Sequence, residues 1–175
     1  EPAMLTLNGA VVFTSADGDA VPIHTMGLPS TYGDQLLEHA STRDFALNYY
    51  RGDRLYSVRN QRTARWLQLY VQQTSSVYDY VESYDALMGT GPDKIIFVGD
   101  PDALDEEESY FREHFGDDVY IVRTWDYYLE FLHRDANKGT GLTALAGAFD
   151  LDLSEVAAFG DGNNDIPMLE VAGTP

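Results

Sequence analysis

Short apolar runs separated by turn residues open the chain. Runs at 5–7 and 10–13 flank Asn8-Gly9, and a further apolar run, 20–23, follows Asp17-Gly18. Asn-Gly and Asp-Gly between short apolar runs are strong signals for β-hairpins, because the central residues of such tight turns need a positive φ. We therefore predict that the chain begins with antiparallel β structure.

Helical and strand patterns alternate through the middle of the chain, after a Gly/Pro-containing connector at 24–30. The spacing of the apolar residues predicts helices at 31–40, 63–72 and 103–115. It predicts strands at 45–50, 55–59, 94–98, 119–124 and 127–132. Residues 26–132 are therefore expected to form an α+β domain of their own.

The pattern changes to helix, strand, helix after residue 133. Residues 138–149 are predicted to be an amphipathic helix, because the apolar residues recur at i, i+3, i+4 and i+7. These residues are Leu142, Leu145, Ala146 and Phe149. The run 156–159 is apolar throughout, as expected of a parallel strand covered on both faces. Pro167 suits the first turn of a helix that starts near Asp165.

The net charge of the chain makes two classes of binding partner, nucleic acids and anionic membranes, unfavourable. Its 175 residues include 29 acidic and 11 basic ones, a formal charge of -18, and its only lysines are Lys94 and Lys138. Nucleic acids and anionic membranes would be repelled over most of such a surface, so neither is an expected partner. The hydrophobic share of 44% is too high for a disordered chain and predicts a globular protein.

Other features bear on the location of the protein. No apolar run approaches the roughly 18 residues of a membrane span, and the first residues, EPAMLTLNG, lack the basic and apolar regions of a signal peptide. The absence of cysteine excludes disulfides and thiolate metal sites and suits a cytoplasmic protein. The chain begins with Glu1 and stops directly after a short helical pattern, which leads us to expect a fragment.

The segment FGDGNND, residues 159–165, concentrates acidic and amide side chains at the end of a predicted strand. In an α/β sheet such a position faces the ligand crevice, and the next helix offers its positive N-terminus. The carboxylates of Asp161 and Asp165 suit a hard cation such as Mg²⁺. A calcium-binding loop that begins at Asp161 would need glycine at position 166 and glutamate at position 172. This chain has Ile166 and Ala172 there, so the segment does not fit a calcium loop. An Asx-rich surface turn is the alternative for this segment alone.

Lys138 strengthens the case for a site. It opens the helix that precedes the acidic segment, in NKGTGL, and so places a cation near the same crevice. A lysine ammonium is a point charge that suits a phosphoryl oxygen or a carboxylate nucleophile. The alternative is an ordinary lysine on a solvated helix face, although the first turn of a helix is slightly unfavourable for a cation.

These motifs resemble those of a known family. NKGTGLTAL and FGDGNNDIPMLEVAG resemble the third and fourth motifs of haloacid dehalogenase-like (HAD) phosphatases of the Cof-type branch. LTLNGAVVF resembles the segment that leaves the core of these proteins, and KIIFVGDPDAL resembles a strand and turn of their large α+β cap. The resemblance implies an α/β fold, with an incomplete HAD-type, Rossmann-like parallel-sheet core formed by 1–25 and 133–175 and an inserted cap formed by 26–132.

The resemblance also implies an activity, the Mg²⁺-dependent hydrolysis of small phosphomonoesters, such as sugar phosphates, through an aspartyl-phosphate. Carried over by position, Lys138 is the lysine of the third motif and Asp161 is a Mg²⁺ ligand. Asn164 would contact the phosphate or the nucleophile, and Asp165 would bind the metal or support one of its ligands. The expected partner is therefore a small phosphorylated metabolite.

The chain departs from the family in two motifs. It lacks the first, Asp-x-Asp-Gly-Thr, which supplies the nucleophile and general acid/base, and the second, a strand that bears Ser or Thr. Its three Asp-x-Asp triplets, 17–19, 100–102 and 150–152, lie in a hairpin turn, in the cap and at the wrong edge of the sheet. We therefore expect no nucleophile in this chain. Two other functions stay open: a P-type ATPase phosphorylation domain, which has a similar acidic loop, and a non-catalytic module that binds a phosphorylated ligand.

Three further features are weaker candidates for function. His133 and Arg134, at the return from cap to core, would be placed to reach a phosphate, although an exposed hinge role is favoured. The tyrosines in 78–84 are expected to pack within the cap rather than to line a substrate pocket. The acidic run 105–108 is expected to be the solvated start of a helix.

Overall fold

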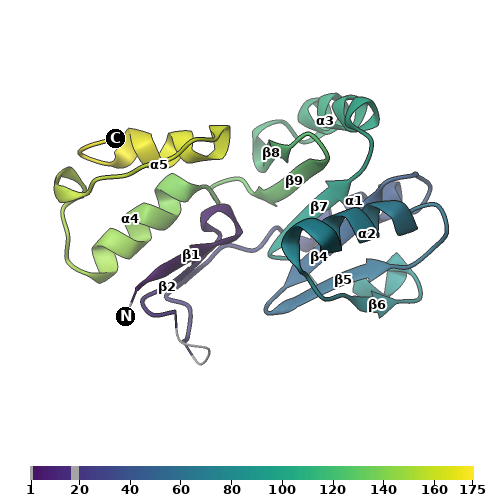
Figure 1. The fold of residues 1–175 in the computed structure, drawn as a ribbon, viewed down its shortest axis with the longest axis horizontal. Coiled ribbons are helices and arrows are strands. Elements are labelled where there is room, and N and C mark those ends of the chain that lie inside the picture. Colours follow the sequence, from purple (N-terminus) through teal and green to yellow (C-terminus); the bar gives the residue numbers. More distant parts are fainter. Residues whose placement is uncertain (1, 17–19) are drawn as a thin grey trace. The chain divides into compact units, whose positions relative to one another are not determined.

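The chain forms two compact units in the computed structural model (Figure 1). The structure describes residues 2–16 and 20–175. The larger unit is Gly27–Arg134, and the smaller unit combines Glu1–Met26 with Asp135–Pro175. The smaller unit is therefore built from both ends of the chain, and the larger unit is inserted between them in the sequence.

A six-stranded sheet with the strand order β6-β5-β4-β7-β9-β8 forms the centre of the larger unit. Neighbouring strands are antiparallel except β5 and β6, which run parallel. The strands are β4 (Ala46–Arg51), β5 (Arg54–Val58), β6 (Asp79–Val81), β7 (Lys94–Val98), β8 (Val119–Trp125) and β9 (Tyr128–His133). All five predicted strands are confirmed. The sixth, β6, was not predicted, because three residues are too few to establish an alternation.

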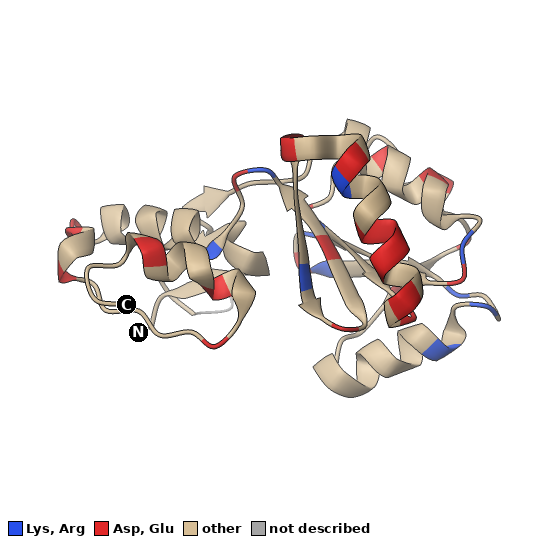
Figure 2. Ribbon diagram, turned by 90° about the horizontal axis from the view of Figure 1, so that it is seen from above, with Lys and Arg blue, Asp and Glu red and all other residues tan. Residues whose placement is uncertain are grey.

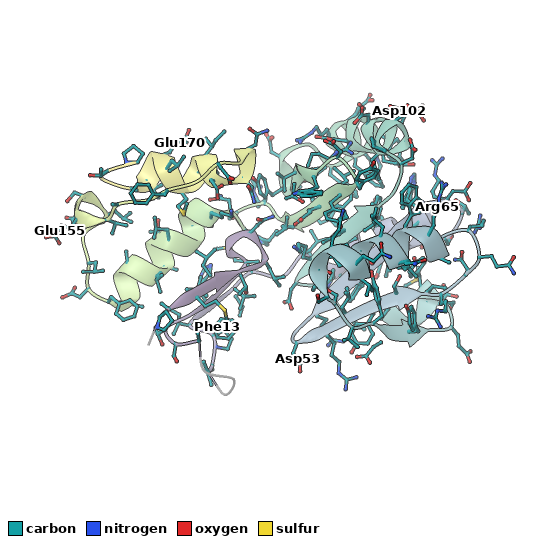
Figure 3. The ribbon with its side chains drawn as sticks, in the orientation of Figure 1. Phe13, Asp53, Arg65, Asp102, Glu155 and Glu170 are labelled. Carbon is teal, nitrogen blue, oxygen red and sulfur yellow. The ribbon has the colours of Figure 1, made fainter. Side chains whose placement is uncertain are left out.

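Helices cover both faces of this sheet, because alternate residues of a strand point to opposite sides. Leu47 and Tyr49 of β4 share a core with residues of two helices, whereas Ala46 of the same strand packs against the third helix. Side chains fill the space between the sheet and these helices (Figure 3). The helices are α1 (Ser30–Ala40) and α3 (Pro101–Phe115) in the first core and α2 (Ala64–Thr74) in the second.

Both cores consist of residues of the larger unit. Large side chains such as Phe97 and Phe131 are fully buried there. Each such side chain stabilises the fold by about 1.5–3 kcal/mol relative to an exposed position. We therefore expect the larger unit to fold on its own, which remains a prediction.

The prediction that the acidic run 105–108 is the solvated start of a helix is only partly correct, because Asp105 and Glu106 are exposed but the helix begins at Pro101 and Glu107 is buried. Glu107 is only 6% exposed, and its carboxylate lies 2.5 Å from His39 Nε2. Helix geometry explains the burial, because residue 107 lies one turn after Leu104 and one turn before Phe111. Both of these side chains are buried in the core, so Glu107 shares their face of α3.

Tyr78 and Tyr84 pack within the larger unit, as predicted. Tyr84 is buried, and its hydroxyl accepts a hydrogen bond from the backbone of β4 at 3.3 Å. The hydroxyl of Tyr78 donates to Asn48 Oδ1 at 2.7 Å. Burial raises the pKa of the Tyr78 hydroxyl and of the Tyr84 hydroxyl. Tyr80 is more exposed and lies under the guanidinium of Arg59. The packing prediction is therefore confirmed for Tyr78 and Tyr84, whereas Tyr80 lies at the surface and lines a cavity with Arg59 and residues of α2.

The smaller unit contains a three-stranded antiparallel sheet in the order β1-β2-β3. Strands β1 (Met4–Thr6) and β2 (Val11–Phe13) flank the 3₁₀ turn Leu7–Gly9, which confirms the first predicted hairpin. The predicted turn at Asp17-Gly18 lies outside the described residues. The chain returns to the sheet only at β3 (His24–Thr25).

Residues 20–23 were predicted to form the returning strand, and this prediction is wrong. The side chain of Val21 is 79% exposed, and although the N–H of Ile23 donates to Val12 O at 2.8 Å, the strand that pairs with β2 consists of residues 24 and 25. Pro22 explains the delay, because proline has no N–H to donate to a neighbouring strand. The connector predicted at 24–30 therefore begins with a short strand.

The C-terminal part of the smaller unit has the two predicted helices but not the predicted strand. The helices are α4 (Lys138–Ala148) and α5 (Ile166–Val171). Residues 156–159 make only a single parallel bridge, from Ala157 to Thr174, and Phe159 is 87% exposed. A buried parallel strand needs a partner along each edge, and the described residues supply only this bridge. The predicted apolar stripe of α4 is likewise only partly buried, with Ala146 at 4% and Phe149 at 49% exposure.

Candidate functional site

The start of α4 is fixed by a capping box. Asn137 Oδ1 accepts hydrogen bonds from the backbone N–H groups of Gly139 and Thr140 at 2.9 and 3.0 Å. Thr140 Oγ1 accepts in return from Asn137 N at 3.2 Å. Such reciprocal bonds satisfy backbone donors that the first turn of a helix leaves unpaired. The cap therefore holds Lys138 as the first residue of α4.

Lys138 reaches from α4 to the acidic segment. Its ammonium donates a short hydrogen bond to Asp165 Oδ1. The other oxygen, Asp165 Oδ2, accepts from the backbone N–H groups of Asp161 at 3.2 Å and Gly162 at 3.0 Å. Asp165 is only 6% exposed, so an ion pair and two backbone donors replace its hydration shell.

Asp165 is held in its ionised form by these contacts. The hydrogen bond from Lys138 holds the pKa of the carboxyl below its usual range, against the opposing effect of burial. The N–H groups of Gly162 and Asp161 act in the same direction. A carboxylate that accepts several hydrogen bonds keeps its charge even where solvent is excluded. The pair is therefore a fixed plus and minus charge between α4 and the acidic segment.

Glycines allow the elements of this site to approach one another. A Cβ on Gly160 would lie 2.3 Å from the Cβ of Asp165, and one on Gly139 would lie 2.3 Å from the backbone oxygen of Pro167. A Cβ on Gly9, whose φ is +95°, would lie 2.1 Å from the backbone oxygen of Asn137. Real Cβ atoms do not come so close, so a larger residue at any of these positions would push the site apart.

The side chain of Asn164 joins the site to the first hairpin. Its Nδ2 donates to Asn8 Oδ1 at 3.0 Å. Asn8 follows β1 in the 3₁₀ turn and has a left-handed backbone, with φ 55°. The sequence pattern presented Asn8 only as a turn residue, and no signal in the sequence linked it to a segment 156 positions away.

The oxygen ligands suit Mg²⁺, but the described residues do not complete its coordination. Asp161 is exposed, whereas both oxygens of Asp165 already accept hydrogen bonds. Within residues 2–16 and 20–175, no group of three His, Cys, Asp or Glu side chains is placed to hold a metal. Mg²⁺ prefers octahedral oxygen coordination and keeps several waters. Asp161 therefore fits as a direct ligand, and Asp165 fits as the partner that orders the loop.

The weaker candidates lie in the larger unit. His133 ends β9, and Arg134 pairs with Asp118 at 3.4 Å. The side chain of Arg134 is 52% exposed. Both residues thus adjoin the return of the chain to the smaller unit, and contact of either with a phosphate remains a prediction.

The charge around Lys138 is unusual even for this acidic chain. The smaller unit contains ten acidic residues and one basic residue, Lys138. Figure 2 shows red segments over this unit and little blue, and Figure 3 shows the exposed side chains of Glu155 and Glu170 at its surface. Within this unit, a negatively charged ligand would therefore be attracted mainly to the ammonium of Lys138.

Comparison with known proteins extends over the whole chain. Residues 1–175 match the model of the haloacid dehalogenase-like hydrolases. An HMP-PP phosphatase of Yersinia enterocolitica is 30% identical over 170 residues, which cover 97% of this chain and 60% of that relative. The structure of TM0651 from Thermotoga maritima superposes on this chain with a TM-score of 0.77 at 26% sequence identity. The superposition covers 95% of this chain and 60% of the TM0651 chain.

A haloacid dehalogenase-like hydrolase from Bacteroides thetaiotaomicron has the same fold, with a TM-score of 0.83 at 22% identity over 98% of this chain and 63% of that one. The chain thus spans less than two thirds of the length of each of these three proteins. No helix in the part of the chain that the structure describes is long and apolar enough to cross a bilayer. From its full-length match and its fold, the chain belongs to the haloacid dehalogenase-like hydrolase family.

Proposed function

We propose that this chain is part of a Mg²⁺-dependent phosphatase that hydrolyses small phosphomonoesters through an aspartyl-phosphate. The observation that carries the proposal is the contact of Lys138, the only basic residue of the smaller unit, with the buried, ionised Asp165. Asp161 and Asn164 belong to the same segment. A fixed cation, an amide and an exposed carboxylate in one place suit a phosphoryl group better than they suit packing.

Lys138 is the residue proposed to bind a phosphoryl oxygen. Its point charge would stabilise the negative charge that spreads over the phosphoryl oxygens during transfer. Asp165 holds the ammonium in place through its short contact, and the N–H groups of Asp161 and Gly162 hold Asp165. Asn164 would orient the phosphate or the attacking carboxylate. Mg²⁺ bound by Asp161 would offset the charge of the phosphate in this acidic unit.

The nucleophile is proposed to come from outside these 175 residues. In the two described Asp-x-Asp triplets, Asp100 and Asp152 serve as helix caps. Asp100 Oδ1 accepts from Asp102 N at 3.2 Å at the start of α3. Asp152 Oδ1 accepts from Ser154 N at 2.9 Å, a bond that lowers the pKa of Asp152. Relatives such as the Yersinia phosphatase are longer than this chain, which leaves room for a further segment.

The proposed substrate is a small phosphorylated metabolite. A formal charge of -18 disfavours nucleic acids and other polyanions as substrates. The name of the Yersinia relative, an HMP-PP phosphatase, supports a small substrate with phosphate groups. Sugar phosphates and similar metabolites of the cytoplasm are therefore the compounds to test first.

A non-catalytic module that binds a phosphorylated ligand is the second candidate. The capping roles of Asp100 and Asp152 favour it, because they leave neither carboxylate as a nucleophile beside Lys138. Such a module would keep the lysine and the acidic segment but would not turn over a phosphate ester.

Turnover of p-nitrophenyl phosphate with Mg²⁺ separates the two functions. We expect no turnover by the 175-residue chain and clear turnover by a longer chain that includes the upstream coding sequence. A longer chain that binds inorganic phosphate but does not turn over the ester would establish the binding module. Turnover by the 175-residue chain that disappears in Asp161→Ala would show that the nucleophile lies within it, and turnover that persists in this variant would indicate a contaminating phosphatase.

A further inference from the structure

The turn between β1 and β2 has an uncommon backbone. Leu7, Asn8 and Gly9 have φ values of 49°, 55° and 95°, so three consecutive residues are in the left-handed region. Left-handed backbone is uncommon outside glycine, and asparagine tolerates it better than most residues. Strained backbone of this kind gathers at functional sites, where the surrounding structure holds it in place.

The two glycines of this region allow the turn to approach α4 closely. A Cβ on Gly9 would lie 2.1 Å from the backbone oxygen of Asn137, and one on Gly141 would lie 2.9 Å from the Cα of Gly9. The backbone contact between turn and helix is therefore made at Gly9.

The side chain of Asn8 fixes the orientation of Asn164. Nδ2 of Asn164 donates to Asn8 Oδ1 at 3.0 Å. The opposite end of the same amide, Asn164 Oδ1, lies against Gly162, where a Cβ would approach it to 2.8 Å. An amide has a donor end and an acceptor end, and a half-turn exchanges them at little cost unless a partner distinguishes them. Rotation of the Asn164 amide alone would bring its Oδ1 against Asn8 Oδ1, so the hydrogen bond disfavours the exchange as long as Asn8 keeps its own orientation.

We propose that Asn8 is a positioning residue for the phosphatase reaction. By accepting from Asn164 Nδ2, it keeps Asn164 Oδ1 on the side of Gly162, within the segment that carries Asp161. One N–H of Asn164 Nδ2 is then engaged by Asn8, and the second N–H of the same amide is the donor that would meet a phosphoryl or carboxylate oxygen. This inference rests on the proposed function, because it assigns to Asn8 a role that acts only through Asn164.

Two substitutions separate the side chain of Asn8 from its backbone. Asn8→Gly keeps the left-handed backbone and removes the acceptor, whereas Asn8→Asp keeps both an acceptor oxygen and tolerance of this backbone. Asp150→Gly is the matched control, because Asp150 lies in the same unit, is exposed and also has a left-handed φ, 54°.

The first measurement is the side-chain amide signal of Asn164 in ¹⁵N-labelled 175-residue chain. We expect the hydrogen exchange of this amide to accelerate in Asn8→Gly, but not in Asn8→Asp or Asp150→Gly. An unchanged exchange rate of the Asn164 amide in Asn8→Gly would overturn the inference. This measurement does not depend on catalysis.

The second measurement is kcat in the longer, active chain. We expect Asn8→Gly to lower kcat about tenfold, the effect of one neutral hydrogen bond, and to leave KM unchanged. Added to Asn164→Ala, it should lower kcat no further, because the two residues act as one unit. Additive losses would overturn the inference. Absence of turnover in the wild-type longer chain would overturn the proposed function instead, and the amide signal would still show whether Asn8 holds Asn164.

Discussion

The two lysines of the chain each pair with a buried carboxylate, but in different surroundings. Lys94 Nζ lies 2.9 Å from Glu130 Oε2, between the neighbouring strands β7 and β9, and the two side chains are 10% and 7% exposed. Glu130 Oε1 also accepts from Thr124 Oγ1 at 2.7 Å. Lys138 pairs with Asp165 across a helix and a turn, and its side chain is 25% exposed.

This difference separates a structural ion pair from a site. The sheet fixes the backbone positions of Lys94 and Glu130, and the ring of Tyr50 lies 5.2 Å from the ammonium of Lys94. A ligand has no open approach to that ammonium. Lys138 keeps an exposed part, and backbone N–H groups share the charge of its partner Asp165. The same two functional groups are therefore enclosed by the sheet in one unit, and in the other they form the partly exposed pair to which we assign the proposed function.

The largest effect is expected from breaking the pair in the sheet. Lys94→Ala leaves the carboxylate of Glu130 buried without its cation, so the free energy of unfolding should fall by about 3–5 kcal/mol. Replacing both residues, Lys94→Met with Glu130→Leu, should recover most of this loss, because it removes both buried charges. Urea unfolding of the 175-residue chain measures both variants. A loss of about 1 kcal/mol or less for Lys94→Ala, as for an exposed pair, would contradict the comparison.

Lys138→Ala should lower turnover strongly and change the free energy of unfolding less than Lys94→Ala does. Loss of transition-state stabilisation by about 2.7–4 kcal/mol corresponds to a fall in turnover of about a hundredfold to a thousandfold. The free energy of unfolding should change less than in Lys94→Ala, because Asp165 keeps two backbone donors. Lys138→Arg should restore little activity, since a planar fork replaces a point charge. Kinetics of the longer chain provide the test, and near-wild-type turnover in Lys138→Ala would return this lysine to the solvated-face interpretation.

Acid should affect the Lys138 pair in a defined direction. The pKa of Asp165 is lowered in the folded chain, mainly by Lys138. Its charge therefore contributes stability that is complete above the unfolded-state pKa, about 4, and is lost as the pH falls through the lower folded-state value. In Lys138→Ala the folded-state pKa should rise toward the unfolded-state value, so this loss should become smaller and should end at a higher pH, and Asp165→Asn should remove this part of the pH dependence. Urea unfolding between about pH 2 and 6 tests both; superimposable acid profiles of wild type and Lys138→Ala would exclude the linkage.

The smallest effect is expected from Mg²⁺ itself. With Asp161 as the direct ligand and Asp165 engaged by Lys138, the 175-residue chain should bind Mg²⁺ only weakly, in about the millimolar range. Titration calorimetry should show that Asp161→Ala removes this binding and that the matched change Asp152→Ala does not. Equal heats for wild type and Asp161→Ala would show that the acidic segment is not the metal site.

The elements that the sequence predicts well are those with a complete local signal. Strand β7 begins and ends as predicted, because Lys94 and Gly99 bound an apolar run, and α3 ends at Phe115 before a glycine with positive φ. The position of Lys138 at the start of α4 was predicted from local sequence, because it precedes a glycine at the beginning of a helical pattern. Such features depend on neighbours in the sequence and can be predicted from them.

The failures come from partners far away in the chain. The sequence groups Glu107 with its acidic neighbours, but its burial depends on His39, 68 positions earlier. The run 156–159 is apolar enough for a strand, but a strand also needs neighbouring strands. The role proposed for Asn8 depends on its hydrogen bond with Asn164, and the local sequence around neither residue predicts this contact. Side-chain contacts between distant segments are what composition and periodicity leave out.

The glycines of α4 bear on the engineering of this scaffold for heat resistance. Replacing glycine by alanine within a helix commonly raises stability by about 0.5–1 kcal/mol, because the unfolded chain loses freedom. A methyl group on Gly147 would have nothing within 4 Å of it, so this position would accept the change. At Gly139 and Gly141 the same methyl group would strike the backbone of Pro167 or the side chain of Leu5. One helix thus contains one position that would accept the stabilising change and two positions at which the same change would disrupt the contacts around Lys138.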